Sequence, residues 1–254
     1  MKRTAAVLAV LALTGCGAES GDTTTTVGEG GTDLVVFAAA SLKQSFTEIG
    51  ERFKTDNPGT AVEFSFAGSS DLVTQLTQGA SADVFASADA KNMDKAAEAG
   101  LLSGGPVDFA SNTLTIAVAA GNPKQITGFR DLTREGLNVV VCAPQVPCGS
   151  ATERIEKTTA VQLNPVSEES SVGDVLGKVT SGEADAGLVY VTDVMGAGDE
   201  VDAVAFPETT DAVNTYPIAA LKESADPELA RRFVEYVTGP EGQSVLDAAG
   251  FAKP

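Results

Sequence analysis

The sequence predicts an α/β protein with two lobes, and three observations lead to that prediction. Short apolar runs that suit buried strands alternate with segments whose apolar residues recur at helical spacing. About nine such strands can be counted, whereas an open sheet usually holds about 4–6 strands. A length of 254 residues allows one or two domains with a large core. We therefore expect two lobes, each with a mostly parallel sheet flanked by helices.

The N-terminal segment has the features of an export signal. A basic start precedes an apolar run at residues 5–13, which is shorter than the ~20 residues of a membrane span. The Leu-Thr-Gly-Cys sequence that ends at Cys16 resembles the bacterial lipobox. We expect residues 1–15 to be a signal peptide and Cys16 to be lipidated; the alternative is a plain signal peptide with an incidental cysteine. Residues 16–32, rich in Thr and Gly, predict a flexible tether.

The folded part is expected to begin near Asp33. Leu34–Phe37 is a continuous apolar run, as in a strand buried on both faces. Ser41 then precedes apolar residues at helical spacing and forms a capping-box pattern with Gln44, so Ser41 is predicted to be an N-cap. The same reasoning predicts strands at 62–66, 82–86 and 114–118, and helices from Gly68-Ser69-Ser70 onward and over 90–99.

The alternation continues to the C-terminus. A second capping box, Ser150 with Glu153, predicts a helix start, and Ser170-Ser171 predicts another. Further strands are predicted at 139–141, 186–191, 201–206 and 218–221, and helices at 129–132, 227–237 and 240–249.

Composition excludes several classes of function. The chain has no histidine, which removes His-based catalytic triads and imidazole metal sites, and it has only 3 cysteines. A net charge of −18 disfavours nucleic acid and anionic membrane surfaces as partners. Glycine-rich phosphate motifs and serine-hydrolase motifs are absent, and Glu168-Glu169 is expected to be a solvated loop. We expect neither an enzyme nor a cofactor.

Small hydroxylic residues recur at predicted helix starts, namely Ser41, Ser69-Ser70, Ser150 and Ser170-Ser171. Helix N-termini present free N–H groups and a partial positive charge, so together they could hold an anion. Each serine alone could equally be an ordinary N-cap. Because the chain as a whole repels anions, short-range dipoles would have to bind one, and a neutral donor site favours a fully ionised oxyanion.

Several segments, in one order along nearly the whole folded part, resemble the periplasmic molybdate-binding proteins of ABC importers (the ModA family), here in a lipoprotein form. The matching segments are Val36–Leu42, Phe66–Ser70, Ala82–Asp89, Gly187–Asp193, Tyr216-Pro217 and Thr238–Gly242. The resemblance implies a class II binding-protein fold, in which the chain passes between two lobes twice and the ligand lies in the cleft between them. Residues 33–117 plus 214–254 would form lobe 1, and residues 118–213 would form lobe 2.

The resemblance also implies a set of oxyanion-binding residues. Ser41 and Ser69 would donate from hydroxyl and backbone N–H groups, Cys148 and Val172 from backbone N–H groups, and Tyr190 from its phenol. Molybdenum would enter only as the oxyanion, with no protein ligand to a cation. The implied protein is an extracytoplasmic monomer that binds molybdate, and also tungstate, for an ABC permease and ATPase, and meets the membrane only through its lipid. Sulfate or another tetrahedral oxyanion is the alternative ligand; an extracytoplasmic enzyme or a ligand-sensing receptor is a more distant alternative.

The sequence departs from the family at Cys148, where a small residue such as Ala is usual. Cys142 lies six positions earlier, and two nearby cysteines in an exported protein suggest a disulfide. Such a bond would stabilise the fold by roughly 2–2.5 kcal/mol and would stiffen the anion loop of the second lobe. Two free thiols are the alternative.

Overall fold

The structure, a computed structural model, describes residues 32–254. This part of the chain contains two five-stranded sheets. The first strand begins at Thr32, next to the predicted start at Asp33. The predicted signal peptide, the lipidation of Cys16 and all but the last residue of the tether lie outside the described residues. No helix in the described part is long and apolar enough to cross a membrane.

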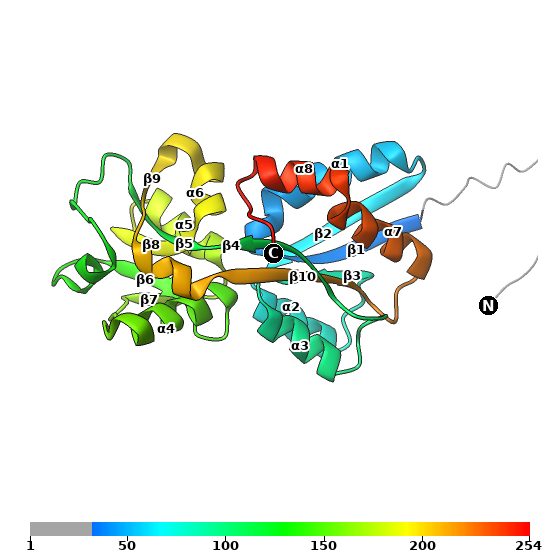
Figure 1. The fold of residues 1–254 in the computed structure, drawn as a ribbon, viewed down its shortest axis with the longest axis horizontal. Helices are drawn as coiled ribbons and strands as arrows, with labels where there is room; N and C mark the ends of the chain where they lie inside the picture. Colours follow the sequence, from blue (N-terminus) through cyan, green and yellow to red (C-terminus); the bar gives the residue numbers. More distant parts are fainter. Residues whose placement is uncertain (1–31) are drawn as a thin grey trace, which may run out of the picture. The chain divides into compact units, whose positions relative to one another are not determined.

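The first sheet has the strand order β2-β1-β3-β10-β4. Its strands are β1 (Thr32–Ala39), β2 (Thr60–Ala67), β3 (Val84–Ala86), β4 (Val107–Asn112) and β10 (Asn214–Ala220). One face is covered by α1 (Lys43–Asp56), α7 (Pro227–Thr238) and α8 (Pro240–Ala248), and the other by α2 (Ser69–Thr77) and α3 (Ala90–Glu98) (Figure 1). Side chains alternate along β1, so Val36 packs with Phe46 of α1 while Phe37 packs with Leu72 of α2. Burial on both faces explains the continuous apolar run of β1.

The second sheet has the order β7-β6-β8-β5-β9. Its strands are β5 (Leu114–Ala119), β6 (Val139–Cys142), β7 (Ser167–Glu169), β8 (Ala186–Tyr190) and β9 (Val201–Val204). It packs against α4 (Pro147–Thr159), α5 (Val172–Thr180) and α6 (Val191–Ala197) (Figure 1). Short 3-10 helices complete the described chain: η1 (Ala40–Leu42), η2 (Phe129–Thr133), η3 (Gly198–Glu200) and η4 (Pro207–Ala212).

The chain passes between the sheets twice, from β4 to β5 and from β9 back to β10. The α/β fold with two lobes is confirmed. The sheets are mixed rather than mostly parallel, because β10 and β5 run antiparallel to their neighbours, while β1 and β6 pair in parallel. Strand β5 lies wholly in the second sheet, whereas the predicted division kept residues up to 117 in the first lobe. Only Thr113 separates β4 from β5, so no turn in the sequence marks the crossing.

Several elements differ from the sequence predictions. Strand β4 was not predicted because polar residues, Ser111 and Asn112, occupy its buried end. The predicted loop at Glu168-Glu169 is wrong: both belong to edge strand β7, where Glu169 pairs with Lys178 at 3.1 Å. Helix α6 was missed, and the segment predicted as a strand through residue 191 ends at Tyr190.

Candidate functional site

One small cavity is lined by all five residues predicted to bind an oxyanion. Its lining comprises Ala39, Ala40, Ser41, Gly68, Ser69, Ala88, Val146, Pro147, Cys148, Val172 and Tyr190. The five come from five separate segments: η1, the start of α2, the first turn of α4, the start of α5 and the end of β8. Backbone N–H groups in the first turn of a helix have no partner within that helix, so these segments can present donors to the cavity.

Ser69 holds its hydroxyl in a defined direction. It is the first residue of α2, after the N-cap Gly68, and it is fully buried. Its Oγ accepts a hydrogen bond from the backbone N–H of Ala88 at 3.0 Å. A hydroxyl has one proton, and since Ala88 uses a lone pair, that proton stays available for a ligand.

Ser41 lines the cavity, but it is not the helix N-cap that the sequence predicted. It lies within η1, and α1 begins only at Lys43 without any side-chain cap, so the predicted N-cap at Ser41 is wrong. Its Oγ lies 3.0 Å from the phenol oxygen of Tyr216. The capping pattern with Gln44 failed because the chain leaves β1 through a 3-10 turn before the α-helix starts.

A disulfide between Cys142 and Cys148 closes the loop that leads into α4, with the two Cα atoms 5.6 Å apart. The predicted bond is confirmed. The helix begins at Pro147, so the predicted start at Ser150 is wrong; the N–H of Ser150 already donates to the carbonyl of Val146. The bond thus ties the first turn of α4, which lines the cavity, to the end of β6.

Val172 is the first residue of α5, behind a conventional cap. The N-cap Ser171 accepts from the N–H of Asp174 through its Oγ at 3.2 Å, as the sequence predicted for this helix start. Val172 is buried and its side chain is apolar, so its backbone N–H is the group that it can donate to a ligand.

Tyr190 brings a buried phenol to the cavity. Its oxygen accepts a hydrogen bond from the Asn214 amide at 2.7 Å. Burial raises the pKa of Tyr190 well above its usual value, so the phenol stays protonated and can donate to an anion.

The two lobes touch around the cavity. A Cβ built on Gly68 would lie 2.1 Å from the carbonyl oxygen of Ser170, so only glycine permits this approach of α2 to the segment before α5. Asn112 donates to Thr192 across the first crossing at 2.8 Å. The cavity that remains has a volume of about 10 Å³, enough for one water. Organic ligands usually need about 300–1,000 Å³, so this cavity is far too small for one.

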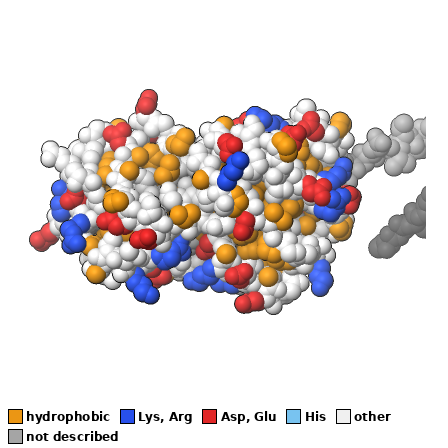
Figure 2. All heavy atoms as spheres, viewed as in Figure 1, with side chains coloured by type: hydrophobic (Ala, Val, Ile, Leu, Met, Phe, Trp, Pro, Cys, Tyr) orange, Lys and Arg blue, Asp and Glu red, His pale blue; other side chains and the backbone are white. Residues whose placement is uncertain are grey.

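The cavity lining holds no Asp, Glu, Lys or Arg, and Tyr190 is its one titratable side chain. A ligand would therefore meet neutral donors and no carboxylate able to accept its proton. The face of the molecule in Figure 2 shows acidic and basic side chains interspersed, without a basic cluster around one point. In the described residues no group of three or more His, Cys, Asp or Glu could hold a metal ion.

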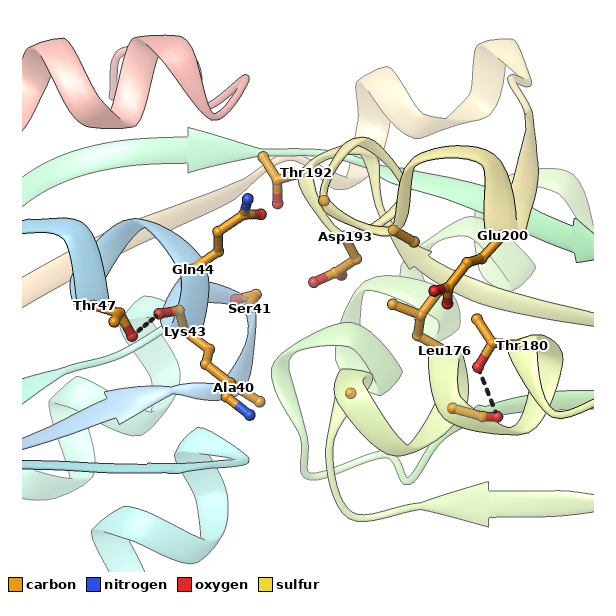
Figure 3. Close-up of a pocket in the computed structure, with 14 residues that line it drawn as sticks. Ala40, Ser41, Lys43, Gln44, Thr47, Leu176, Thr180, Thr192, Asp193 and Glu200 are labelled. Carbon is orange, nitrogen blue, oxygen red and sulfur yellow. Dashed lines mark hydrogen bonds between the residues drawn. The ribbon is translucent and has the colours of Figure 1, made fainter.

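A larger groove of about 590 Å³ adjoins the cavity and shares Ala40 and Ser41 with it. Asp193 of α6 points from one wall toward Ser41 and Gln44 on the other (Figure 3). Its carboxylate accepts from the N–H of Tyr190 at 2.8 Å. Burial nevertheless raises the pKa of Asp193 to about 7.

Sequence reasoning missed Asn214, Ala88 and Gly68, which support or shape the cavity without carrying a predicted ligand contact. Gly68 and Ala88 fall inside segments that matched the family. Asn214 lies two residues before Tyr216-Pro217, outside the matching segments.

Comparisons with known proteins match the chain to one family. The model of the family described as bacterial extracellular solute-binding protein matches residues 34–252. The chain is 62% identical over 226 residues to the molybdate-binding protein ModA of Mycobacterium tuberculosis, covering 89% of this chain and 87% of that one. It is 30% identical to the molybdate-binding protein ModA of Escherichia coli, covering 86% and 88%.

Solved structures share the fold. The periplasmic molybdate-binding protein of Azotobacter vinelandii matches with a TM-score of 0.75 at 23% identity, over 87% of this chain and 99% of that one. The sulfate-binding protein SubI of Mycobacterium tuberculosis matches with a TM-score of 0.77 at 20% identity, over 87% of each chain. The two-lobed binding-protein fold implied by the resemblance is thereby confirmed.

Proposed function

The chain belongs to the bacterial extracellular solute-binding proteins, and from that premise we propose that it captures molybdate, and also tungstate, for an ABC importer. Members of this family bind solutes for transport and are not enzymes. The single observation that carries the proposal is the convergence of Ser41, Ser69, Cys148, Val172 and Tyr190 on one small cavity. The 62% identity to a mycobacterial molybdate-binding protein supports the choice of ligand.

In this proposal every site group donates to the anion. Ser41 and Ser69 donate through hydroxyl and backbone N–H groups, Tyr190 through its phenol, and Cys148 and Val172 through backbone N–H groups. The carboxylate-free lining gives no acceptor for a protonated anion, so molybdate, tungstate and sulfate fit better than hydrogen phosphate. The proposed lobes, residues 32–112 with 214–254 and residues 114–212, would close on the ion and open to release it to the permease.

We further propose that Cys16 carries a lipid that holds the protein at the outer face of the cell membrane. A relative that is 27% identical over 97% of this chain, from Bacillus subtilis, is named a putative substrate-binding lipoprotein of an ABC transporter. Intact mass of the protein isolated from membranes tests the proposal. Expected is a chain beginning at Cys16 with an added diacylglycerol and acyl group; a soluble chain cleaved elsewhere would contradict it.

Sulfate is the second candidate ligand, because a donor-only site accepts any tetrahedral dianion and a relative that is 26% identical is named a sulfate-binding protein. Calorimetric titration of the full chain, freed of bound anion by unfolding and refolding, separates the two. Tight one-to-one binding of molybdate and tungstate, with sulfate and phosphate silent, is expected. Tight sulfate binding would change the transported ion, and silence toward all four anions in a folded chain would overturn the oxyanion assignment.

A further inference from the structure

One buried amide outside the predicted site contacts both lobes next to the cavity. Asn214 is the first residue of β10, where the chain returns from the second sheet to the first, and only 2% of it is exposed. Its Nδ2 lies 2.7 Å from the Tyr190 phenol oxygen, 3.0 Å from the carbonyl of Ala88 and 3.2 Å from the carbonyl of Pro147. Ala88, Pro147 and Tyr190 all line the cavity.

The orientation of this amide follows from its neighbours. The Nη2 of Arg154 donates to Oδ1 of Asn214 at 2.5 Å and to the carbonyl of Ala212 at 3.1 Å. A guanidinium can only donate, so the amide oxygen must face Arg154, and two backbone carbonyls can only accept, so Nδ2 must face Ala88 and Pro147. The amide cannot be flipped without losing contacts on both sides.

This fixed amide determines what the Tyr190 phenol can do. Nδ2 has two protons for three acceptors, so one proton is shared; because an amide nitrogen cannot accept, the phenol oxygen at 2.7 Å acts as an acceptor on the side of Asn214. The other polar group beside it is the Tyr216 phenol, whose ring centroid lies 5.9 Å from that of Tyr190. The single proton of the Tyr190 phenol therefore points away from Asn214 and can be directed into the cavity, where an anion is a stronger acceptor than the neutral Tyr216 phenol.

We propose that Asn214 is a positioning and specificity-determining residue, which fixes Tyr190 as an obligate donor and thereby restricts the site to fully ionised oxyanions. This inference rests on the proposed function. Asn214 does not need to touch the ligand: it acts through Tyr190, and through Pro147 it also holds the first turn of α4, next to Cys148. Arg154 supplies the charge-assisted contact that keeps the amide in its orientation.

The test compares Asn214→Asp, Asn214→Ala and Tyr190→Phe in the full chain, by titration with molybdate, sulfate and phosphate. Asn214→Asp keeps the shape and the Arg154 contact but places an acceptor against the phenol, so the Tyr190 proton turns away from the cavity. Molybdate affinity should fall about 30-fold or more in Asn214→Asp, and about 3- to 10-fold in Asn214→Ala and in Tyr190→Phe. In Asn214→Asp the ratio of phosphate affinity to molybdate affinity should rise, because a phenol lone pair now faces the protonated anion.

Coupling between the two residues separates positioning from general support. If Asn214 acts through Tyr190, adding Tyr190→Phe to Asn214→Asp costs little further affinity; losses that simply multiply would overturn the proposal. Asn112→Ala is the matched control, because Asn112 lies opposite Asn214 in the β4–β10 register and donates across the lobes to Thr192, and neither Asn112 nor Thr192 lines the cavity. It should lower the melting temperature and leave the anion ratios as they are.

Should Asn214→Asp fail to fold, Asn214→Ala decides: unchanged molybdate affinity, or a loss that multiplies with that of Tyr190→Phe, would overturn the proposal. The unmodified chain is titrated first. If it binds none of the anions, the proposed function fails and this inference with it. If it binds and only the variants disagree, the proposed function stands and the role of Asn214 alone is rejected.

Discussion

The two lobes contribute to the cavity by different chemistry. The first lobe offers hydroxyls, Ser41 and Ser69, each directed by one hydrogen bond from or to a neighbour in the same lobe. The second lobe offers the backbone of two helix starts, at Cys148 and Val172, together with the Tyr190 phenol. The disulfide holds the first of these helix starts, that of α4, to the end of β6.

This difference predicts which changes weaken binding in each half of the cavity lining, the half from the first lobe and the half from the second. A hydroxyl is lost when its side chain is changed, whereas a backbone N–H survives most substitutions and is lost only when the backbone moves. The first-lobe half should therefore respond to side-chain truncation, and the second-lobe half to loss of its constraints. The contact between the halves should be more sensitive than either.

Gly68→Ala should have the largest effect on affinity, because it disturbs the contact between the two lobes. The new Cβ would lie 2.1 Å from the carbonyl oxygen of Ser170, while the Gly68 backbone, at φ −59°, accepts alanine without strain. The lobes could then fold but not close, so molybdate affinity should fall about 100-fold or more, equivalent to about 2.7 kcal/mol. Calorimetric titration together with the melting temperature of the ligand-free chain measures both consequences.

Gly173→Ala is the control for that substitution. Gly173 also lies near the start of a helix, but a Cβ there meets only Ser171 Oγ, at an ordinary 3.6 Å. It should bind nearly as the unmodified chain does. Equal affinities for the two variants would show that closure at Gly68 is not required.

Ser69→Ala should have the next largest effect. It removes a donor from the cavity and leaves the N–H of Ala88 without its partner, so affinity should fall about 10- to 30-fold. Val172→Ala, the matching change in the second lobe, keeps its backbone N–H and should cost no more than about threefold. A loss at Val172 as large as at Ser69, measured by the same titration, would contradict the division into side-chain and backbone halves.

The same division explains what the sequence could and could not predict. Helix starts carry local signals, so Ser69 and Ser171 were found near the ends of strands from residue type and spacing alone. Local signals failed where tertiary structure decides the boundary: η1 displaces the start of α1 from Ser41, and the disulfide and Pro147 move the start of α4 ahead of Ser150.

Which helix starts meet was not predictable from local pattern. The resemblance to a family supplied Cys148, Val172 and Tyr190, and the structure brings all of them to one cavity with Ser41 and Ser69. Neither the local sequence pattern nor the family resemblance identified Asn214. Its contacts join residues up to 126 positions apart, and a single buried asparagine leaves no periodic signal in the sequence.

Removing the disulfide tests the constraint on the second-lobe half. Replacing Cys142 and Cys148 by serine should lower the free energy of unfolding by roughly 2–2.5 kcal/mol. Affinity should fall only about 3- to 10-fold, because the N–H at the start of α4 remains but is held less firmly. Denaturant unfolding and titration measure the two effects; unchanged affinity with reduced stability would mean that the bond supports the fold alone. Reduction of the unmodified chain should reproduce the double variant.

The smallest effect is expected from Asp193, which faces the first-lobe half across the groove (Figure 3). Its pKa of about 7 lies above the usual 3.8, so the folded state holds a proton that the unfolded state has released between about pH 4 and pH 7. Asp193 thus adds stability that is fully present below pH 4 and lost as pH rises through 7, by about 1–2 kcal/mol for this partly buried group.

The same carboxyl couples proton binding to anion binding. A dianion bound beside Asp193 disfavours its ionised form, so binding should take up a fraction of a proton near pH 7, and affinity should fall about two- to threefold from pH 6 to pH 8. In Asp193→Asn the amide oxygen can still accept from the N–H of Tyr190, while the titration is gone, so both pH dependences should flatten. Titration in buffers of different ionisation enthalpy measures the proton uptake directly. If the unmodified chain and Asp193→Asn take up protons equally, the second-lobe wall of the groove has no electrostatic effect on the ion, and the two halves differ only in their hydrogen-bond donors.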